Sequence, residues 1–425
     1  MRRRPLNSRL TGLVLLTLAV GLVGGFLLGQ QVSLMVTPQV EVPRDTRAEF
    51  ELMAEAWRTI EREYVDQEAV VPRRMAHGGI EGMVETLGDP GHTRFLTPDM
   101  AERHLDQLRG RFEGIGAYVE MRDGQVVIVA PMDSSPAQEA GLKAEEIILG
   151  VNGEDVTDLP LEEVVDRVLG PAGTEVTLTV LNPVTEEERE VTLERAEIHL
   201  ELVAWQRVPE TELAYVRISA FSAGATEQLG HALGEIEEEG IVGLVLDLRD
   251  NPGGILGEAV GVTSRFVESG NVVLRRDAAS EVGEEAVRED IQAVDLPMVA
   301  LINGGTASAA EIVTGALQDY ERAATVGSTT FGAGTVLNRF PLADGAVVLL
   351  AVEEWLTPEG RVIWQRGLAP DVEVDLAPDA EPLVRLRWED LTEAELRDSG
   401  DEQLLRALEL LHSSISDGQS QLRLP

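Results

Sequence analysis

The chain contains a nearly unbroken apolar segment, residues 241–248, in which Asp247 is the only charged side chain. Apolar runs of this length, without polar alternation, are typical of parallel strands that are buried on both faces. Residues 298–302 form a second run of the same kind. The two segments predict an α/β domain with a parallel sheet at its centre.

A glycine-containing stretch follows each apolar segment. Residues 249–254 read Arg-Asp-Asn-Pro-Gly-Gly, and glycines there let backbone N–H groups face a reacting carbonyl, as an oxyanion hole requires. Residues 304–312 follow the second segment, and we expect a helix to begin at Ser308. Ser308 is therefore a candidate nucleophile. The candidates for the oxyanion hole are Gly253, Gly254 and Ala309.

Residues 330–337 read Thr-Phe-Gly-Ala-Gly-Thr-Val-Leu. Together with residues 304–312, this segment resembles the carboxyl-terminal processing peptidases, serine enzymes with an internal PDZ domain. Their pattern here is T-F-G-K-G-x-V-Q, in which the lysine takes the proton of the serine and the glutamine orients the lysine. In this chain the lysine position is Ala333 and the glutamine position is Leu337. The resemblance covers about residues 48 to 412, including the segments 249–254, 356–361, 367–372 and 401–408.

The missing base decides what the resemblance implies for activity. A serine hydroxyl is a weak nucleophile until a neighbouring base takes its proton, and alanine cannot do so. Losing one member of such a unit costs a factor of about 10⁴ to 10⁶ in rate. We therefore expect a weakly active or inactive homologue. The paired loss of lysine and glutamine favours natural replacement over one engineered substitution at Ala333.

Two alternatives remain open. In a related branch of peptidases, a histidine from an upstream turn is the base and a distant glutamate supports it. His92 lies at a comparable point, but that glutamate position holds Trp364 or Gln365, and Glu353 or Glu354 would have to compensate. We expect His92 to be a turn residue, because neither Leu337 nor Trp364 could orient an imidazole. The second alternative is a structural subunit that pairs with an active relative.

Residues 109–196 resemble a PDZ domain. Glycines in the segment 112–117 let backbone N–H groups converge on the terminal carboxylate of a peptide. The domain should bind polypeptide C-termini or unfolded proteins beside a helix over 161–169, with strands over 176–181 and 190–193. The candidate peptide-binding residues are Phe112, Gly114, Ile115, Gly116 and Ala117.

The expected fold class is α/β multidomain. A helical region over 45–108 precedes the PDZ domain; within it, Phe50, Met53, Ala54, Trp57 and Ile60 give one apolar helix face. The resemblance implies a crotonase-like α/β domain over 197–378. A helical tail over 379–425 follows.

The N-terminus predicts a membrane anchor within residues 1–36. Four arginines precede residues 10–29, a stretch without charge that is long enough to span a bilayer. The arginines favour a cytoplasmic N-terminus and an extracytoplasmic body, so a single-pass protein of the cell membrane is expected. A cleaved signal peptide, and hence secretion, is the competing interpretation. Gly21, Gly25 and Gly29 could form a helix-dimer face, so a homo-oligomer is possible.

Composition excludes several classes of function. The formal net charge of −40 argues against a nucleic-acid partner, because phosphates require a basic surface. The chain has no cysteine, which excludes disulfides and thiolate ligands, and its 6 histidines show no metal-ligand spacing. Neither a metal nor a cofactor is expected. Lys143 is the only lysine, so no other lysine can readily replace the one missing at Ala333.

Overall fold

The computed structural model describes residues 44–89, 92–122, 124–132, 135–143, 145–183, 185, 187–377, 382–383 and 391–416. The chain forms two compact units, Met1–Gly78 and Gly79–Pro425, and each is considered by itself. The predicted membrane helix at 10–29, with Gly21, Gly25 and Gly29, lies outside the described residues. Within those residues, no helix combines the length and apolarity needed to cross a bilayer.

The predicted N-terminal helices form, but the apolar face of the first is exposed. The first unit contains η1 (Arg44–Thr46), α2 (Arg47–Glu63) and η2 (Gln67–Ala69), and α3 (Pro72–Glu85) runs on into the second unit. No residue of α2 is buried; Phe50 and Met53 are 44% and 50% exposed.

The predicted helical region 45–108 also contains a strand, which corrects the prediction. Residues Arg94–Leu96 form β1, followed by α4 (Pro98–Leu108). β1 pairs antiparallel with β18 (Val347–Leu356), where Leu96 packs with Val347 and Leu349. Pairing with β18 and burial of the side chains of Phe95 and Leu96 draw this short segment into extended structure.

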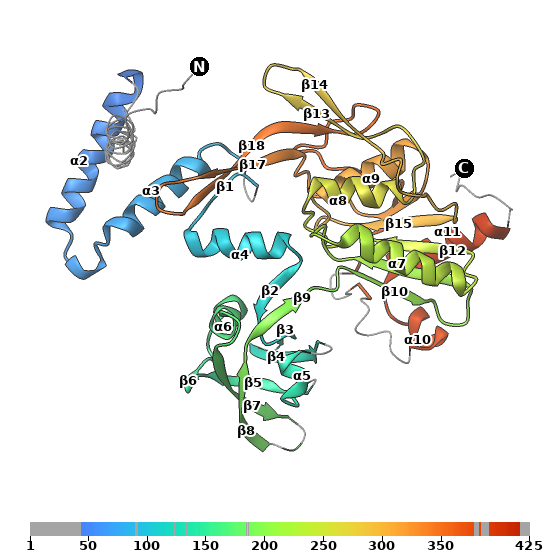
Figure 1. Ribbon diagram of the computed structural model, residues 1–425, viewed down its shortest axis with the longest axis horizontal. Helices are drawn as coiled ribbons and strands as arrows, with labels where there is room; N and C mark the ends of the chain where they lie inside the picture. Colours follow the sequence, from blue (N-terminus) through green and yellow to red (C-terminus); the bar gives the residue numbers. More distant parts are fainter. Residues whose placement is uncertain are drawn as a thin grey trace, which may run out of the picture. The chain divides into compact units, whose positions relative to one another are not determined.

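A six-stranded sheet forms the centre of the second unit, in the order β10-β11-β12-β15-β16-β19. Figure 1 labels β10, β12 and β15 of this sheet. All its strand pairs are parallel except β10 with β11. Its strands are β10 (Val203–Arg207), β11 (Leu213–Ile218), β12 (Gly243–Asp247), β15 (Met298–Ile302), β16 (Ala324–Gly327) and β19 (Val372–Glu373). The two apolar segments of the sequence are β12 and β15, neighbours in this sheet, so the predicted parallel strands are confirmed.

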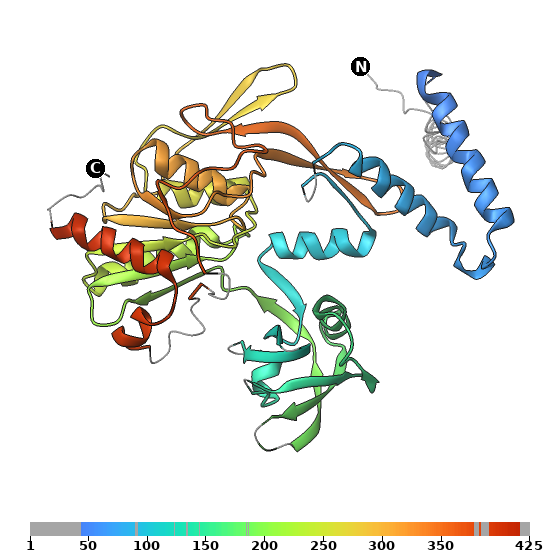
Figure 2. The ribbon, with the colours of Figure 1, turned by 180° about the vertical axis from the view of Figure 1, so that it is seen from behind.

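Helices cover both faces of this sheet. On one face, the core includes residues of α7 (Ala225–Glu238), α8 (Leu256–Ser264) and α9 (Ala309–Asp319). On the other, it includes residues of α10 (Glu393–Arg397) and α11 (Glu402–Ser416), and Figure 2 shows α11 from behind. The helical tail therefore completes the core.

A second sheet runs β1-β18-β13-β14, and β17 also pairs with β18. Its remaining strands are β13 (Asn271–Asp277), β14 (Val282–Ala286) and β17 (Thr335–Pro341).

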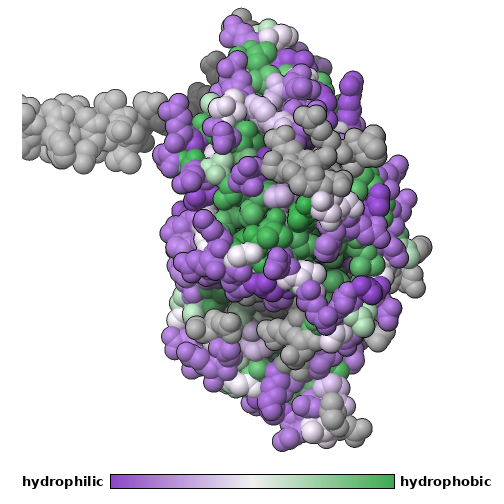
Figure 3. Space-filling view, turned by 90° about the vertical axis from the view of Figure 1, so that its right-hand side faces the viewer, coloured by the Kyte–Doolittle hydropathy of each residue, from purple (hydrophilic) through white to green (hydrophobic). Residues whose placement is uncertain are grey.

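In Figure 3, hydrophilic residues prevail at the margins of the visible face and hydrophobic ones gather toward its middle.

Residues 109–196, which resemble a PDZ domain in sequence, contain a separate sheet in the order β3-β4-β5-β7-β8, with β6 paired to β5. The predicted helix over 161–169 is α6 (Leu161–Val168), and the predicted strands over 176–181 and 190–193 lie within β7 and β8, which confirms them. The remaining elements here are β2 (Arg111–Gly114), β3 (Ala117–Arg122), β4 (Gln125–Pro131), α5 (Pro136–Glu139), β5 (Ile147–Val151), β6 (Glu154–Asp155), β7 (Glu175–Asn182), β8 (Glu187–Glu194) and β9 (Ala196–His199).

Candidate functional site

Ser308 stands at the start of α9, as the sequence predicts. Its backbone has φ 54° and ψ −116°, a conformation that side-chain-bearing residues adopt at a cost of roughly 1–3 kcal/mol. The surrounding contacts must hold this strained turn. Such strain is common at functional sites, and here it presents a half-buried hydroxyl just before the first turn of a helix.

The loop after β12 packs directly against Ser308. The N–H of Ala307 donates to the carbonyl of Asn251 (2.9 Å), and the hydroxyl of Thr306 donates to the carbonyl of Leu248 (2.8 Å). A Cβ on Gly253 would lie 2.7 Å from the Cβ of Ser308, so only glycine allows this approach. The structure therefore brings the two glycine-containing stretches, 249–254 and 304–312, together at Ser308.

The candidate oxyanion donors differ in their hydrogen bonding. The N–H of Gly253 donates to the side-chain oxygen of Asn251 at 2.9 Å. The N–H groups of Gly254 and Ala309 donate to no atom of the described residues. Of the three candidates, Gly254 and Ala309 thus keep donors available for a developing negative charge.

Glu311 connects Ser308 with the lysine position, and sequence reasoning missed it. One carboxylate oxygen accepts the N–H groups of both Ser308 and Ala333, each at 2.9 Å. The other accepts the N–H of Gly332 at 2.8 Å and the hydroxyl of Thr330 at 2.5 Å. Burial raises the pKa of Glu311, although these four hydrogen bonds oppose that rise. An acid three residues after a helix-starting serine was the available signal.

Ala333 is 4% exposed and stands beside Ser308, since both backbone N–H groups reach the same Glu311 oxygen. Leu337 is half-buried in β17, where it pairs with Ala351 of β18. Ala333 and Leu337, the positions of the missing lysine and glutamine, therefore both lie in residues 330–337, the segment that Glu311 holds beside Ser308. Neither side chain can accept a proton.

His92 reaches the same segment. Its Nδ1 and the hydroxyl oxygen of Thr335 are joined by a hydrogen bond of 2.5 Å, and Thr335 lies between Ala333 and Leu337 in sequence. His92 is 8% exposed, and burial lowers its pKa, with Arg94 adding to this effect and Asp89 opposing it. The expectation that His92 has no orienting partner is wrong, because Thr335 supplies one.

The acids considered as supports for His92 have other partners. Glu353 forms an ion pair with Arg275 at 3.3 Å, and Glu354 forms one with Arg276. Trp364 donates from its indole N–H to Asp89 at 3.3 Å. Through Asp89, Trp364 therefore supports the turn that carries His92.

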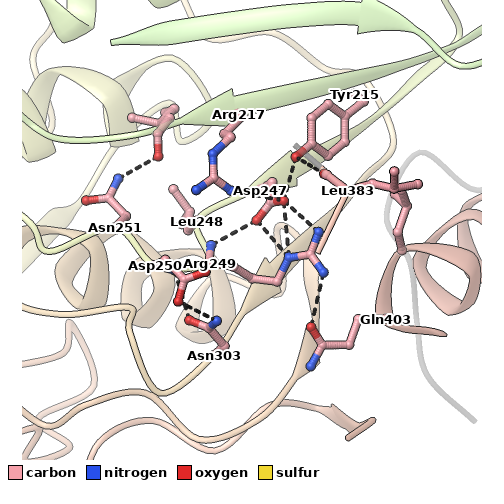
Figure 4. A network of polar contacts seen from close by, with 12 residues as sticks. Tyr215, Arg217, Asp247, Leu248, Arg249, Asp250, Asn251, Asn303, Leu383 and Gln403 are labelled. Atoms are coloured by element: carbon pink, nitrogen blue, oxygen red, sulfur yellow. Dashed lines mark hydrogen bonds and ion pairs between the residues drawn. The ribbon is translucent and has the colours of Figure 1, made fainter. Parts of the chain in front are cut away.

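A buried ionic network holds the loop after β12 to the helical tail (Figure 4). Arg249 donates to Asp247 at 2.8 Å and to Asp401 at 2.8 Å, and all three side chains are fully buried. Burial raises the pKa of Asp247, but Arg249, the charge of Arg217 and the hydrogen bond from Tyr215 together keep that pKa below its usual value. Tyr215 also donates to Asp247, at 2.6 Å. By accepting a hydrogen bond from Arg249, Asp401 holds the start of the loop that leads to Gly253.

The predicted peptide-binding loop has two N–H groups available. Residues Ile115 and Gly116 lie between β2 and β3, and their N–H groups donate to no residue that the structure describes. Gly116 has φ 72°, and a Cβ there would lie 2.5 Å from the Cβ of Ser135. The hydroxyl of Ser135 donates to the Gly116 carbonyl at 2.8 Å, which fixes this turn. The loop is thus shaped to receive an anion.

Comparison with known sequences agrees with this architecture. Residues 212–374 match peptidase family S41, and residues 127–182 match the PDZ domain family. A carboxyl-terminal-processing protease of Synechocystis sp. is 34% identical over 398 residues, covering 89% of this chain and 90% of the relative. A probable CtpA-like serine protease of Staphylococcus epidermidis is 31% identical over 365 residues, covering 85% and 72%.

Two solved structures are also similar. A putative S41 protease from Bacteroides fragilis aligns with a TM-score of 0.52 at 19% identity, covering 80% of this chain and 90% of the other; this likeness concerns the fold. A photosystem II D1 C-terminal processing protease aligns with a TM-score of 0.45 at 30% identity, covering 80% and 95%.

Proposed function

The chain belongs to the carboxyl-terminal processing proteases of peptidase family S41, and on this premise we propose that it binds polypeptide C-termini while hydrolysing them weakly or not at all. Ala333, which cannot accept a proton, stands beside Ser308 where the family places its lysine. Substrate binding and the oxyanion donors of Gly254 and Ala309 do not depend on that lysine, so they remain.

The binding half of the proposal rests on the PDZ loop. With the N–H groups of Ile115 and Gly116 available, a terminal carboxylate would gain charge-assisted hydrogen bonds there. The predicted anchor at 10–29 would place this activity outside the cytoplasm, at the membrane surface. The partners would be unfolded or C-terminally exposed polypeptides, with a second copy or an active relative as further candidates.

We expect peptides with a free, apolar C-terminal residue to bind the full chain more tightly than the same peptides with an amidated C-terminus. Amidation removes the negative charge that the loop would bind, and a charge-assisted hydrogen bond contributes about 1.5–3 kcal/mol, so a difference of about tenfold or more is expected. Isothermal calorimetry with the Ser308→Ala protein measures both affinities without cleavage. Equal affinities would show that the loop does not recognise a carboxylate.

A second candidate function is an active serine peptidase that uses His92 as its base. The hydrogen bond between His92 and Thr335 favours it, because a fixed imidazole is a better base than a free one. Since burial lowers the pKa of His92, the imidazole would be neutral at pH 7 and would lose basicity only below its ordinary value of 6.5. Cleavage by such an enzyme would therefore persist into mildly acidic solution and then fall.

A further inference from the structure

Arg195 is a buried cation in the PDZ domain. It follows β8, is 8% exposed, and donates to four acceptors. Its guanidinium contacts the carbonyl of Val168 (2.7 Å), the carbonyl of Arg167 (3.2 Å), the carbonyl of Glu175 (3.0 Å) and the hydroxyl of Thr174 (3.0 Å). Val168 and Arg167 are the last two residues of α6.

All four acceptors are neutral, and no carboxylate of the described residues forms an ion pair with Arg195. Burial lowers the pKa of Arg195, and no neighbouring charge opposes this. Arginine nevertheless stays protonated in proteins. A full positive charge therefore remains uncompensated in the domain, which is uncommon because buried charges are usually paired.

The charge of Arg195 lies next to the end of α6, on the side away from the predicted peptide-binding loop at Ile115 and Gly116. The N–H of Gly170 donates to the carbonyl of Glu113 at 3.3 Å, and a Cβ on Gly170 would lie 3.0 Å from the guanidinium carbon of Arg195. A Cβ on Gly114 would lie 2.9 Å from the side chain of Leu169. The end of α6 is thus packed between the guanidinium and the end of β2 that leads into Ile115 and Gly116. Figure 1 shows α6 beside β2.

The end of a helix is an unfavourable neighbour for an anion. Its free carbonyls carry a partial negative charge of about half an elementary charge, which would repel a carboxylate at the adjoining loop. Arg195 caps two of these carbonyls and brings a full positive charge to the same place. In a partly desolvated site, such a charge acts more strongly than it would in water.

We propose that Arg195 is the positioning residue that makes this loop selective for a free C-terminal carboxylate. It acts from behind α6 by cancelling the negative helix end and by attracting the anion to the N–H groups of Ile115 and Gly116. The proposal rests on the proposed binding of polypeptide C-termini. The ligand class is a polypeptide with an ionised C-terminus, and the recognised group is the carboxylate.

The test compares the acid and amide forms of one peptide on Arg195→Gln and Arg195→Lys, both in the Ser308→Ala full chain. We expect Arg195→Gln to lower the acid-to-amide affinity ratio about tenfold and Arg195→Lys, which keeps the charge, to preserve it. The matched control is Arg122→Gln at the far end of β3, which removes an exposed charge from the same domain. This control should leave the ratio unchanged.

A purely structural role for Arg195 would weaken acid and amide binding alike, and an unchanged ratio in folded Arg195→Gln overturns the proposal. If Arg195→Gln does not fold, the lysine variant decides, because loss of selectivity despite retained charge also overturns it. Failure of the proposed function looks different: the protein with Arg195 intact would then show no preference for the acid.

Discussion

The double substitution Ala333→Lys with Leu337→Gln should raise Ser308-dependent cleavage of an unfolded polypeptide by about three orders of magnitude or more. Position 333 is buried, and a lysine in such a place has a lowered pKa, which lets it act as a base near neutral pH. Glu311 already holds the backbone of this position beside Ser308. A glutamine at 337 would again orient the lysine, as in the family pattern.

The matched control is Ala333→Met with Leu337→Gln, which adds a side chain of similar length but no proton acceptor. It should stay at the background rate, and so should the restored protein once Ser308 is changed to alanine. If the restored protein folds and still shows background cleavage, the loss of the catalytic unit extends beyond residues 333 and 337.

Arg249→Met should lower the free energy of unfolding of the domain built on the six-stranded sheet by about 3–5 kcal/mol. The substitution leaves Asp247 and Asp401 buried without their cation. The same change should disturb the loop that carries Gly253, which begins at this network. Chemical denaturation followed by circular dichroism measures the effect. A protein that does not fold corresponds to a loss larger than its whole stability.

The control for that substitution is Arg207→Met, because Arg207 makes an exposed ion pair with Glu239. Exposed pairs contribute at most about 1 kcal/mol, so this variant should remain close to the unchanged protein. If Arg249→Met were as mild as Arg207→Met, the buried network would not be what fixes the tail to the sheet.

Local patterns predicted the elements that carry the site. The apolar runs fixed β12 and β15, and the serine-glycine stretch located the start of α9. These features depend on neighbouring residues, so periodicity and glycine placement reveal them. For the same reason the predicted helix over 161–169 differs from the observed α6, Leu161–Val168, by one residue at its end.

Contacts between distant segments could not be predicted in this way. His92 meets Thr335 across 243 positions, and Arg249 meets Asp401 across 152. No local pattern encodes such pairs. β1 was missed because its three residues become extended only through pairing with β18. The role of Glu311 likewise depends on Ala333, 22 residues further on.

If Ser308 lacks an effective base, the protein should show almost no serine-dependent cleavage at any pH between 5 and 8. Cleavage of an unfolded polypeptide is measured side by side for the unchanged protein, Ser308→Ala and His92→Ala, from pH 5 to pH 8. We predict that the unchanged protein will cleave no more than marginally faster than Ser308→Ala, and that His92→Ala will match the unchanged protein. Robust cleavage that disappears in both variants would contradict this account and identify a serine–histidine peptidase.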